Sequence, residues 1–322
     1  MRYAIEKLKG PLNITFDKKV FKQGATLQLK DTLRITQSNI SLRGEGAFVR
    51  IVRTYKWSDA TPYPVKNKKD TYQCHLKKGV TSGIIYIYNA RNIILSGITF
   101  EQVIPGDHGL GKNAYYDAEC FGDQISIFSR KDTKTTGFFN QIWIHNNTFI
   151  RCRDECLSVV RGPLKERAGL SVSYNTFLHT NKVMLIGNSI DKNMNILLSF
   201  YRNTLDGFGQ RGPRIQNAVV HIYNNVYKAW RIYGIGVSKT ARVMIEENCF
   251  IAGKMEKQGI FSFGESDSYA WSRKNTLKNI GKTASTSYTT KTFPKMKKHG
   301  GPWYYTEQMA HSVQSGFNCQ GN

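Results

Sequence analysis

The chain has 322 residues and carries 46 Lys and Arg against 23 Asp and Glu, a formal net charge of +23 at pH 7. This surplus attracts polyanions, so a nucleic acid, an anionic membrane or an acidic polysaccharide is favoured over a basic surface kept only for solubility. No apolar run approaches the roughly 18 residues that a transmembrane helix requires, so we expect no membrane span. The start of the chain lacks the apolar segment of a signal peptide, which suggests a cytosolic protein or one whose leader has been removed.

The first 55 residues predict a short helix followed by short strands. Residues 3–9 are expected to form a helix that caps one end of the fold. Brief apolar segments with turn residues between them predict strands at Leu12–Phe16, Thr26–Leu29, Leu33–Thr36 and Ile40–Leu42. Two polar stretches with Pro, Gly and Lys, residues 55–82 and 101–122, interrupt the pattern, and we expect them to be loops inserted on one face.

One pattern recurs from the middle of the chain onward: an alternating apolar strand, an asparagine and another pair of apolar residues. Period-2 alternation indicates strands, and asparagine suits the bend between two strands because it tolerates a left-handed backbone. Stacked asparagines can also hydrogen-bond in a ladder. The recurring positions are Asn147, Asn175, Asn203, Asn225 and Asn248.

Repeats of 20 to 30 residues or so are typical of solenoids, in which each coil contacts only its neighbours. We therefore predict an all-β parallel β-helix that forms a single domain over residues 1–322. The coils are expected from about residue 12 to 255, and the tail, residues 256–322, is expected to pack along the outside. A β-sandwich with regularly spaced strands is the alternative, and five copies of one pattern make it less favourable.

Six cysteines are spread along the chain without a CxxC pair or a nearby cluster of histidines, so a zinc site is not expected. Their even number suits disulfides, but buried free thiols fit the sequence about equally well. The six are Cys74, Cys120, Cys152, Cys156, Cys249 and Cys319.

Charged residues near successive turns predict a site on one flank of the solenoid. Asp154, Lys182 and Arg211 follow one another at intervals close to one coil. Positions one coil apart stack on the same face, so these side chains should form a row. A guanidinium and an ammonium group in such a row suit an anionic sugar chain. Paired bases would also lower each other's pKa, because like charges disfavour the charged form.

Several segments taken together resemble the pectate lyase family of the pectate and pectin lyase superfamily. The resemblance runs over about residues 3–250 and includes Lys182–Gly187, Gln210–Ile215 and Tyr233–Gly236, in the family's order and spacing. It implies a right-handed, single-stranded parallel β-helix that cleaves uronic-acid polysaccharides such as pectate by β-elimination.

The resemblance also implies roles for individual residues. Arg211 matches the Brønsted base that removes the C5 proton, Lys182 a ligand of the substrate carboxylate, and Arg214 an arginine that supports the site. An arginine is an awkward base because its usual pKa exceeds about 12, so neighbouring cations and partial desolvation would have to help. Gln216, at a substrate-binding position, stands where the family has a further arginine, which removes one expected contact.

The calcium site that the resemblance implies is incomplete in this sequence. Asp123 and Asp154 match two acidic ligands, but Ser158 stands where a third acid is expected. Glu155, at a position usually occupied by glycine, is the candidate replacement. Calcium prefers about six to eight oxygen ligands with carboxylates among them, so we expect a weakened or absent calcium site.

We expect a polysaccharide lyase that acts on an acidic polysaccharide, with Lys182 and Arg211 as its catalytic residues. The alternative is a non-catalytic β-helix that binds acidic glycans; Ser158 and Gln216 favour it, and the retained Lys182–Arg211 pair opposes it. Nucleic-acid binding would need aromatic platforms among the basic residues and ranks third, so no nucleic-acid partner is expected. The family's extracellular substrates predict a secreted protein, and we expect a monomer.

Overall fold

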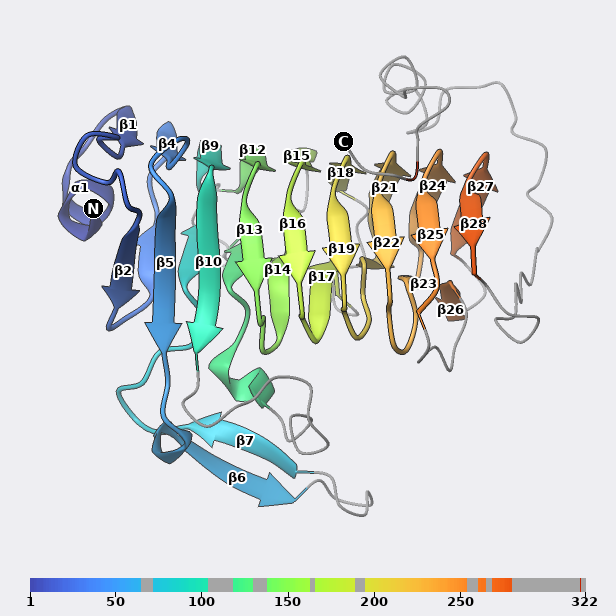
Figure 1. Cartoon of the computed structure of the whole chain (residues 1–322), viewed down its shortest axis with the longest axis horizontal. Helices are drawn as coiled ribbons and strands as arrows, with labels where there is room; N and C mark the ends of the chain where they lie inside the picture. Colours follow the sequence, from blue (N-terminus) through green and yellow to red (C-terminus); the bar gives the residue numbers. More distant parts are fainter. Residues whose placement is uncertain are drawn as a thin grey trace.

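The computed structural model describes residues 1–64, 72–103, 118–129, 138–162, 166–188, 195–253, 260–264 and 268–279, together with Cys319. The chain winds into a parallel β-helix whose coils stack along one axis (Figure 1). A complete coil contributes one short strand to each of three long sheets, which we call sheets A, B and C. The predicted all-β solenoid is therefore confirmed.

Within the described residues, sheet A has the strand order β1 (Leu12–Thr15), β4 (Ile40–Arg43), β9 (Arg91–Ser96), β12 (Asn140–His145), β15 (Ala168–Ser173), β18 (Ile196–Tyr201), β21 (Val219–Tyr223), β24 (Arg242–Glu246) and β27 (Tyr269–Arg273). Sheet B has the order β2 (Ala25–Leu29), β5 (Val49–Thr54), β10 (Ile98–Val103), β13 (Thr148–Ile150), β16 (Thr176–Leu178), β19 (Thr204–Asp206), β22 (Val226–Lys228), β25 (Cys249–Ile251) and β28 (Thr276–Lys278). Sheet C has the order β3 (Leu33–Ile35), β8 (Ile85–Tyr88), β11 (Ile125–Phe128), β14 (Glu155–Val160), β17 (Lys182–Ile186), β20 (Arg214–Gln216), β23 (Ile235–Ser238) and β26 (Phe261–Gly264).

The core consists of apolar side chains that repeat at the same position in every coil. In sheet B, Phe100, Phe149 and Phe177 are in strand register and fully buried. Their rings stack, with centroids 5.3 Å and 5.0 Å apart. Because alternate residues of a strand point to opposite faces, the residues that flank each phenylalanine in its own strand point outward.

The predicted asparagine ladder runs along the bend between sheets A and B. Asn175 shows the repeating contact: its Oδ1 accepts hydrogen bonds from the backbone N–H and the Nδ2 of Asn147, at 3.0 Å and 3.1 Å. Its own Nδ2 donates to Ile144 O and to Asn203 Oδ1. The ladder continues through Asn225 and Asn248 to Asn275, one step further than the sequence pattern indicated.

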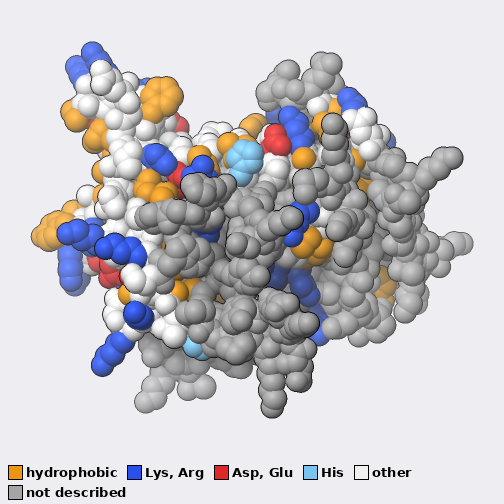
Figure 2. Space-filling view, turned by 60° about the horizontal axis from the view of Figure 1, so that its bottom comes forward, with side chains coloured by type: hydrophobic (Ala, Val, Ile, Leu, Met, Phe, Trp, Pro, Cys, Tyr) orange, Lys and Arg blue, Asp and Glu red, His pale blue; other side chains and the backbone are white. Residues whose placement is uncertain are grey.

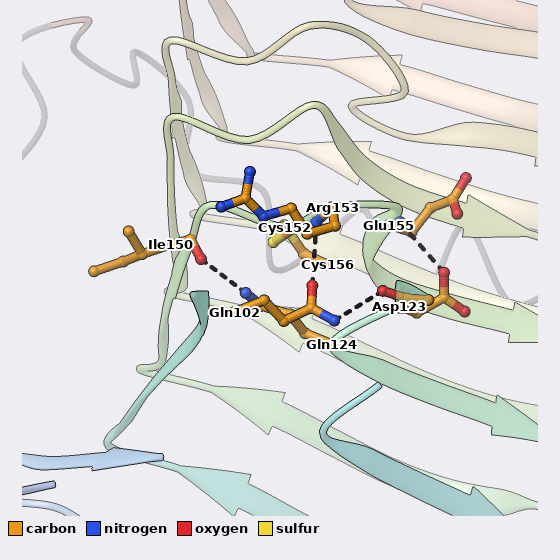
Figure 3. Close-up of a disulfide and its surroundings, with 9 residues drawn as sticks. Gln102, Asp123, Gln124, Ile150, Cys152, Arg153, Glu155 and Cys156 are labelled. Carbon is orange, nitrogen blue, oxygen red and sulfur yellow. Dashed lines mark hydrogen bonds between the residues drawn. A yellow bond between two sulfur atoms is a disulfide. The ribbon is translucent and has the colours of Figure 1, made fainter. Parts of the chain in front are cut away.

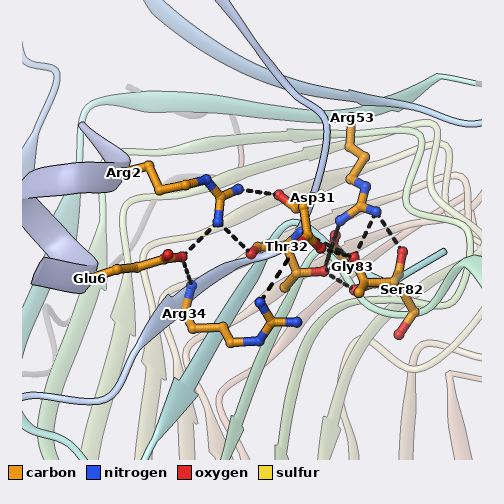
Figure 4. Close-up of polar contacts among 9 residues, drawn as sticks. Arg2, Glu6, Asp31, Thr32, Arg34, Arg53, Ser82 and Gly83 are labelled. Carbon is orange, nitrogen blue, oxygen red and sulfur yellow. Dashed lines mark hydrogen bonds and ion pairs between the residues drawn. The ribbon is translucent and has the colours of Figure 1, made fainter. Parts of the chain in front are cut away.

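The N-terminal end of the solenoid is closed by α1 (Arg2–Lys7), close to the helix expected at 3–9. Arg2 pairs with Glu6 and donates to Thr32 O at 2.9 Å, which ties the helix to the first coil (Figure 4). Arg53, almost fully buried, donates to Thr32 Oγ1 and to Gly83 O, so it joins the first two coils. These contacts cover the open end of the core.

Both predicted insertions leave the solenoid between a strand of sheet B and the next strand of sheet C. The first contains the short helix η1 (Trp57–Asp59) and an antiparallel hairpin of β6 (Ala60–Pro64) and β7 (Tyr72–Leu76), which projects from the stack (Figure 1). The second contains η2 (Ala118–Phe121) and begins later than expected, because β10 continues to Val103.

The repeat extends beyond the boundary expected near residue 255. Strands β26, β27 and β28 form a further coil that ends at Lys278. Most of the predicted outer tail lies outside the described residues. Cys319 is described, and its disulfide to Cys249 places it beside sheet B.

Candidate functional site

Five charged side chains gather where the chain turns from sheet B into sheet C. Asp123 precedes β11, Asp154 and Glu155 lie at the start of β14, Lys182 begins β17 and Arg211 precedes β20. These four strands are neighbours in sheet C. The helical winding therefore brings together residues that are almost 90 positions apart in the sequence.

The predicted row exists, with a register that differs by one residue from the expected one. Lys182 is in strand register with Glu155 rather than with Asp154, and it forms a bridge with Gln210 rather than with Arg211. Its side chain nevertheless reaches Asp154, and the Nζ to Oδ1 distance is 2.8 Å. Sequence spacing predicts the coil on which each residue lies. The turns between strands decide which residue of the next coil is in register with it.

The predicted acidic trio forms one cluster. One carboxylate oxygen from each of Asp123, Asp154 and Glu155 lies within 4.8 Å of the others. Asp123 accepts a hydrogen bond from Ser126 Oγ at 2.8 Å and one from the backbone N–H of Glu155 at 3.3 Å. Burial, together with the nearby charge of Asp154, raises the pKa of Asp123 to about 6. Burial and the Asp123 charge also raise the pKa of Glu155.

Arg211 contacts an acid rather than a second base. Its NH1 group forms an ion pair with Oε1 of Glu155, whose side chain is 3% exposed. Burial by itself lowers the pKa of Arg211, but the charges of Glu155, Tyr233 and Asp154 outweigh it, so the pKa is raised. The expectation that neighbouring cations lower this pKa is therefore wrong for the free protein, because carboxylates lie nearer.

A disulfide between Cys152 and Cys156 closes the turn that carries Asp154 and Glu155 (Figure 3). Two buried amides hold the same turn: Gln102 Oε1 accepts from the backbone N–H of Arg153, and Gln124 Nε2 donates to Ile150 O at 2.7 Å. These supporting residues were not predicted, because hydrogen bonds to the backbone leave no pattern in the sequence. The sequence left disulfides and buried free thiols as alternatives for the cysteines. Disulfides form here and between Cys249 and Cys319.

The remaining predicted residues lie on the outward face of sheet C. Arg214 is partly exposed, and its guanidinium interacts with the Tyr233 hydroxyl, which also interacts with Arg211. Tyr233 lies in one of the segments that carry the family resemblance, but its contact with both arginines became visible only in the structure. Gln216 is 8% exposed and donates to Ser238 Oγ at 3.1 Å, so little of its side chain remains for a substrate.

The acidic cluster offers the hard oxygen atoms that calcium prefers. Ser158 lies on β14 in register with Ser126 and Leu185 and is not among the clustered residues, whereas Glu155 is. Two of the three carboxylates are already paired, Asp154 with Lys182 and Glu155 with Arg211. A divalent ion thus finds suitable ligands, but it competes with two cations of the protein itself.

The face of the molecule drawn in Figure 2 is basic in its described part. Figure 2 shows more Lys and Arg than Asp and Glu side chains on the described part of the face. Among the described helices, none has the length and apolar character needed to cross a bilayer.

The pectate lyase family model matches residues 74–317 of this chain. Among curated proteins, a pectate lyase of Zinnia elegans is 32% identical over 176 residues, which cover 52% of this chain and 40% of that protein. Putative pectate lyase 11 of Arabidopsis thaliana is 30% identical over 261 residues, covering 78% of this chain and 51% of that protein. The chain spans about half the length of the curated relatives it matches.

Among solved structures, Jun a 1, the major allergen from cedar pollen, has a TM-score of 0.58 at 21% sequence identity. The alignment covers 87% of this chain and 72% of that one, and it supports the parallel β-helix fold. The match to the family model includes all five charged residues of the cluster and most of the solenoid. The chain belongs to the pectate lyase family.

Proposed function

We propose that the protein is a polysaccharide lyase that cleaves pectate or a related uronic-acid polysaccharide by β-elimination. One observation carries the proposal: Lys182, Arg211 and Arg214 come from two adjacent coils and lie at one edge of sheet C, beside the acidic cluster. Adjacent strands are about 4.8 Å apart, so this arrangement presents cations along the solenoid axis at short intervals. Such a row complements an extended chain of uronic-acid units.

In the proposed reaction, Arg211 takes the proton from C5 and the C4–O bond to the leaving sugar breaks. The electron pair of the C5–H bond becomes the C4–C5 double bond, and the leaving oxygen receives a proton. Lys182 pairs with the substrate carboxylate and so stabilises the charge that develops next to C5. Arg214 supports the same region from β20.

We propose that Asp123, Asp154 and Glu155 hold calcium weakly. When bound, calcium would add positive charge where the substrate carboxylate lies. The ion pairs to Lys182 and Arg211 support only weak binding, because a metal ion would have to displace them.

A panel of polymers tests the proposal. Polygalacturonate, methylated pectin, alginate and polyglucuronate are incubated with the protein, with and without a chelator, and unsaturated uronates are followed by their ultraviolet absorbance. A rise with polygalacturonate is expected, reduced but not abolished by chelator. No rise with any polymer, despite binding, would instead support a non-catalytic acidic-glycan-binding protein, which the pairing of Arg211 with Glu155 favours as the second candidate.

We also propose that the protein is secreted and acts as a monomer. The disulfides Cys152–Cys156 and Cys249–Cys319 support secretion, because disulfides persist mainly in oxidising compartments. Sedimentation of the purified protein tests the monomer.

A further inference from the structure

The guanidinium of Arg211 is held by a carboxylate from two coils away. Arg211 lies before β20, yet it pairs with Glu155 at the start of β14, 56 residues earlier. Lys182 lies on the coil between them, in register with Glu155. The Arg211 side chain therefore extends back along the solenoid axis, past the coil of Lys182, to reach its partner.

This ion pair is largely shielded from solvent. The side chain of Arg211 is 19% exposed and that of Glu155 is 3% exposed. With Asp123 and Asp154 ionised as well, three carboxylates face the two cations Lys182 and Arg211. An anion that approaches Arg211 therefore meets a cation that already has a partner, inside a cluster with negative charge in excess.

Arg214 provides the contrast on the same coil. Its guanidinium interacts with the Tyr233 hydroxyl, and no acidic side chain among the described residues forms an ion pair with it. A substrate carboxylate can therefore pair with Arg214 without displacing an acid from the described part of the chain. Binding at Arg211 requires an exchange of partners.

We propose that Glu155 is an internal competitor of the substrate: it occupies the Arg211 guanidinium in the free protein, and a uronic-acid unit binds productively only after Arg211 has left Glu155. This inference rests on the proposed function, and it names Glu155 as the residue that sets the affinity of the protein for its substrate. Because binding at Arg211 requires the pair to break, removing the Glu155 charge should lower KM, and a chelator in every assay keeps the proposed calcium role of Glu155 out of the comparison.

The variant Glu155→Gln tests this, because glutamine keeps the shape of the side chain and loses its charge. Glu101→Gln is the matched control, since Glu101 is also a buried carboxylate that pairs with arginines, Arg50 and Arg151, but it lies outside the cluster. With polygalacturonate and a chelator at about pH 8, E155Q should lower KM about tenfold, and E101Q should change KM by less than about twofold. Equal effects of the two variants, or an unchanged KM in E155Q, would overturn the inference.

A second measurement does not depend on cleavage. Galacturonate monomer has no glycosidic bond to break, and its binding can be followed by titration calorimetry. With a chelator present, E155Q should bind it about tenfold more tightly than the wild type, and E101Q should bind it within about twofold of the wild type. If the wild type cleaves no polymer, the lyase proposal fails, whereas the binding difference still decides the role of Glu155.

Thermal unfolding separates competition from a purely structural role. If Glu155 serves only stability, E155Q should shift the Tm and leave the affinity for galacturonate unchanged. That result would contradict the inference. If E155Q does not fold, Glu155→Ala replaces it in both measurements.

Discussion

At the residue scale, the ion pair between Arg211 and Glu155 joins the proposed base to the acidic cluster. An arginine can serve as a base only if its proton is easily lost, yet the Glu155 charge stabilises the protonated form. The same ion pair keeps a buried carboxylate neutralised beside Asp123 and Asp154. If Arg211 is the base of the proposed reaction, catalysis and stability make opposite demands on this contact.

Replacing Arg211 should affect activity and stability together. Arg211→Ala leaves Glu155 buried without its cation, which should cost about 3 kcal/mol of unfolding free energy, and it should reduce cleavage by a factor on the order of 10³. The double variant R211A/E155Q should regain most of the stability in chemical denaturation and none of the activity. Cleavage by R211A at the wild-type rate would show that Arg211 is not the base.

Glu246 predicts a pH dependence away from the site. Burial favours its protonated form, but hydrogen bonds from His221 and Arg273 outweigh burial and lower its pKa below the ordinary value of 4.5. A carboxyl whose pKa is lower in the folded state stabilises the fold above its unfolded pKa, and this contribution is lost as the pH falls through the folded pKa.

The variant Glu246→Gln should therefore be less stable than the wild type at pH 7, by about 2 kcal/mol, with the difference closing below pH 4 or so. Urea denaturation across this pH range measures it. Glu247→Gln is the control, because Glu247 pairs only at 3.5 Å with the exposed Lys274 and should change stability by less than about 1 kcal/mol. A constant difference between wild type and E246Q at all pH values would contradict the assignment.

At the element scale, the bend between sheets A and B determines how the coils stack. Each ladder asparagine satisfies a backbone N–H and a backbone carbonyl of the preceding coil, as Asn203 does with Asn175 and Val172. The ladder connects neighbouring coils at one corner, while the turns from sheet B to sheet C are left free to vary. That second corner carries the insertions and the charged cluster.

Removing a ladder asparagine should therefore lower the unfolding free energy strongly in the middle of the ladder and only slightly at its end. Asn203→Ala leaves a buried N–H and a buried carbonyl without partners and should lower the unfolding free energy by about 3 kcal/mol. Asn275→Ala, at the partly buried end, should cost about 1 kcal/mol. Denaturant midpoints give both values, and equal losses would show that the ladder does not act through buried hydrogen bonds.

At the scale of the whole molecule, two disulfides act on different properties. Cys249–Cys319 joins residues 70 positions apart, whereas Cys152–Cys156 spans four positions and brackets two acids of the site. Closing a longer loop removes more entropy from the unfolded chain. The long disulfide should therefore matter more for stability and the short one more for the site.

Paired alanine variants test this division. C249A/C319A should lose about 4 kcal/mol of stability and C152A/C156A about 2 kcal/mol, in the chain-entropy estimate for these loop lengths. Cleavage should show the opposite order, because only the second variant loosens the turn that carries Asp154 and Glu155. Assays of both variants well below their unfolding temperatures provide the comparison, and equal losses of activity would contradict the positional role of Cys152–Cys156.

The sequence by itself determined the β-helix, its asparagine corner and the successive coils on which Asp154, Lys182 and Arg211 lie. Strand alternation and a regular period can be read from short stretches of the chain. It also identified the family. Only the tertiary structure decided that Lys182 aligns with Glu155 and that Arg211 reaches back two coils to the same residue. The reason is physical: the period assigns a residue to a coil, whereas the turns between strands set the register within about one residue and the side-chain contacts that follow.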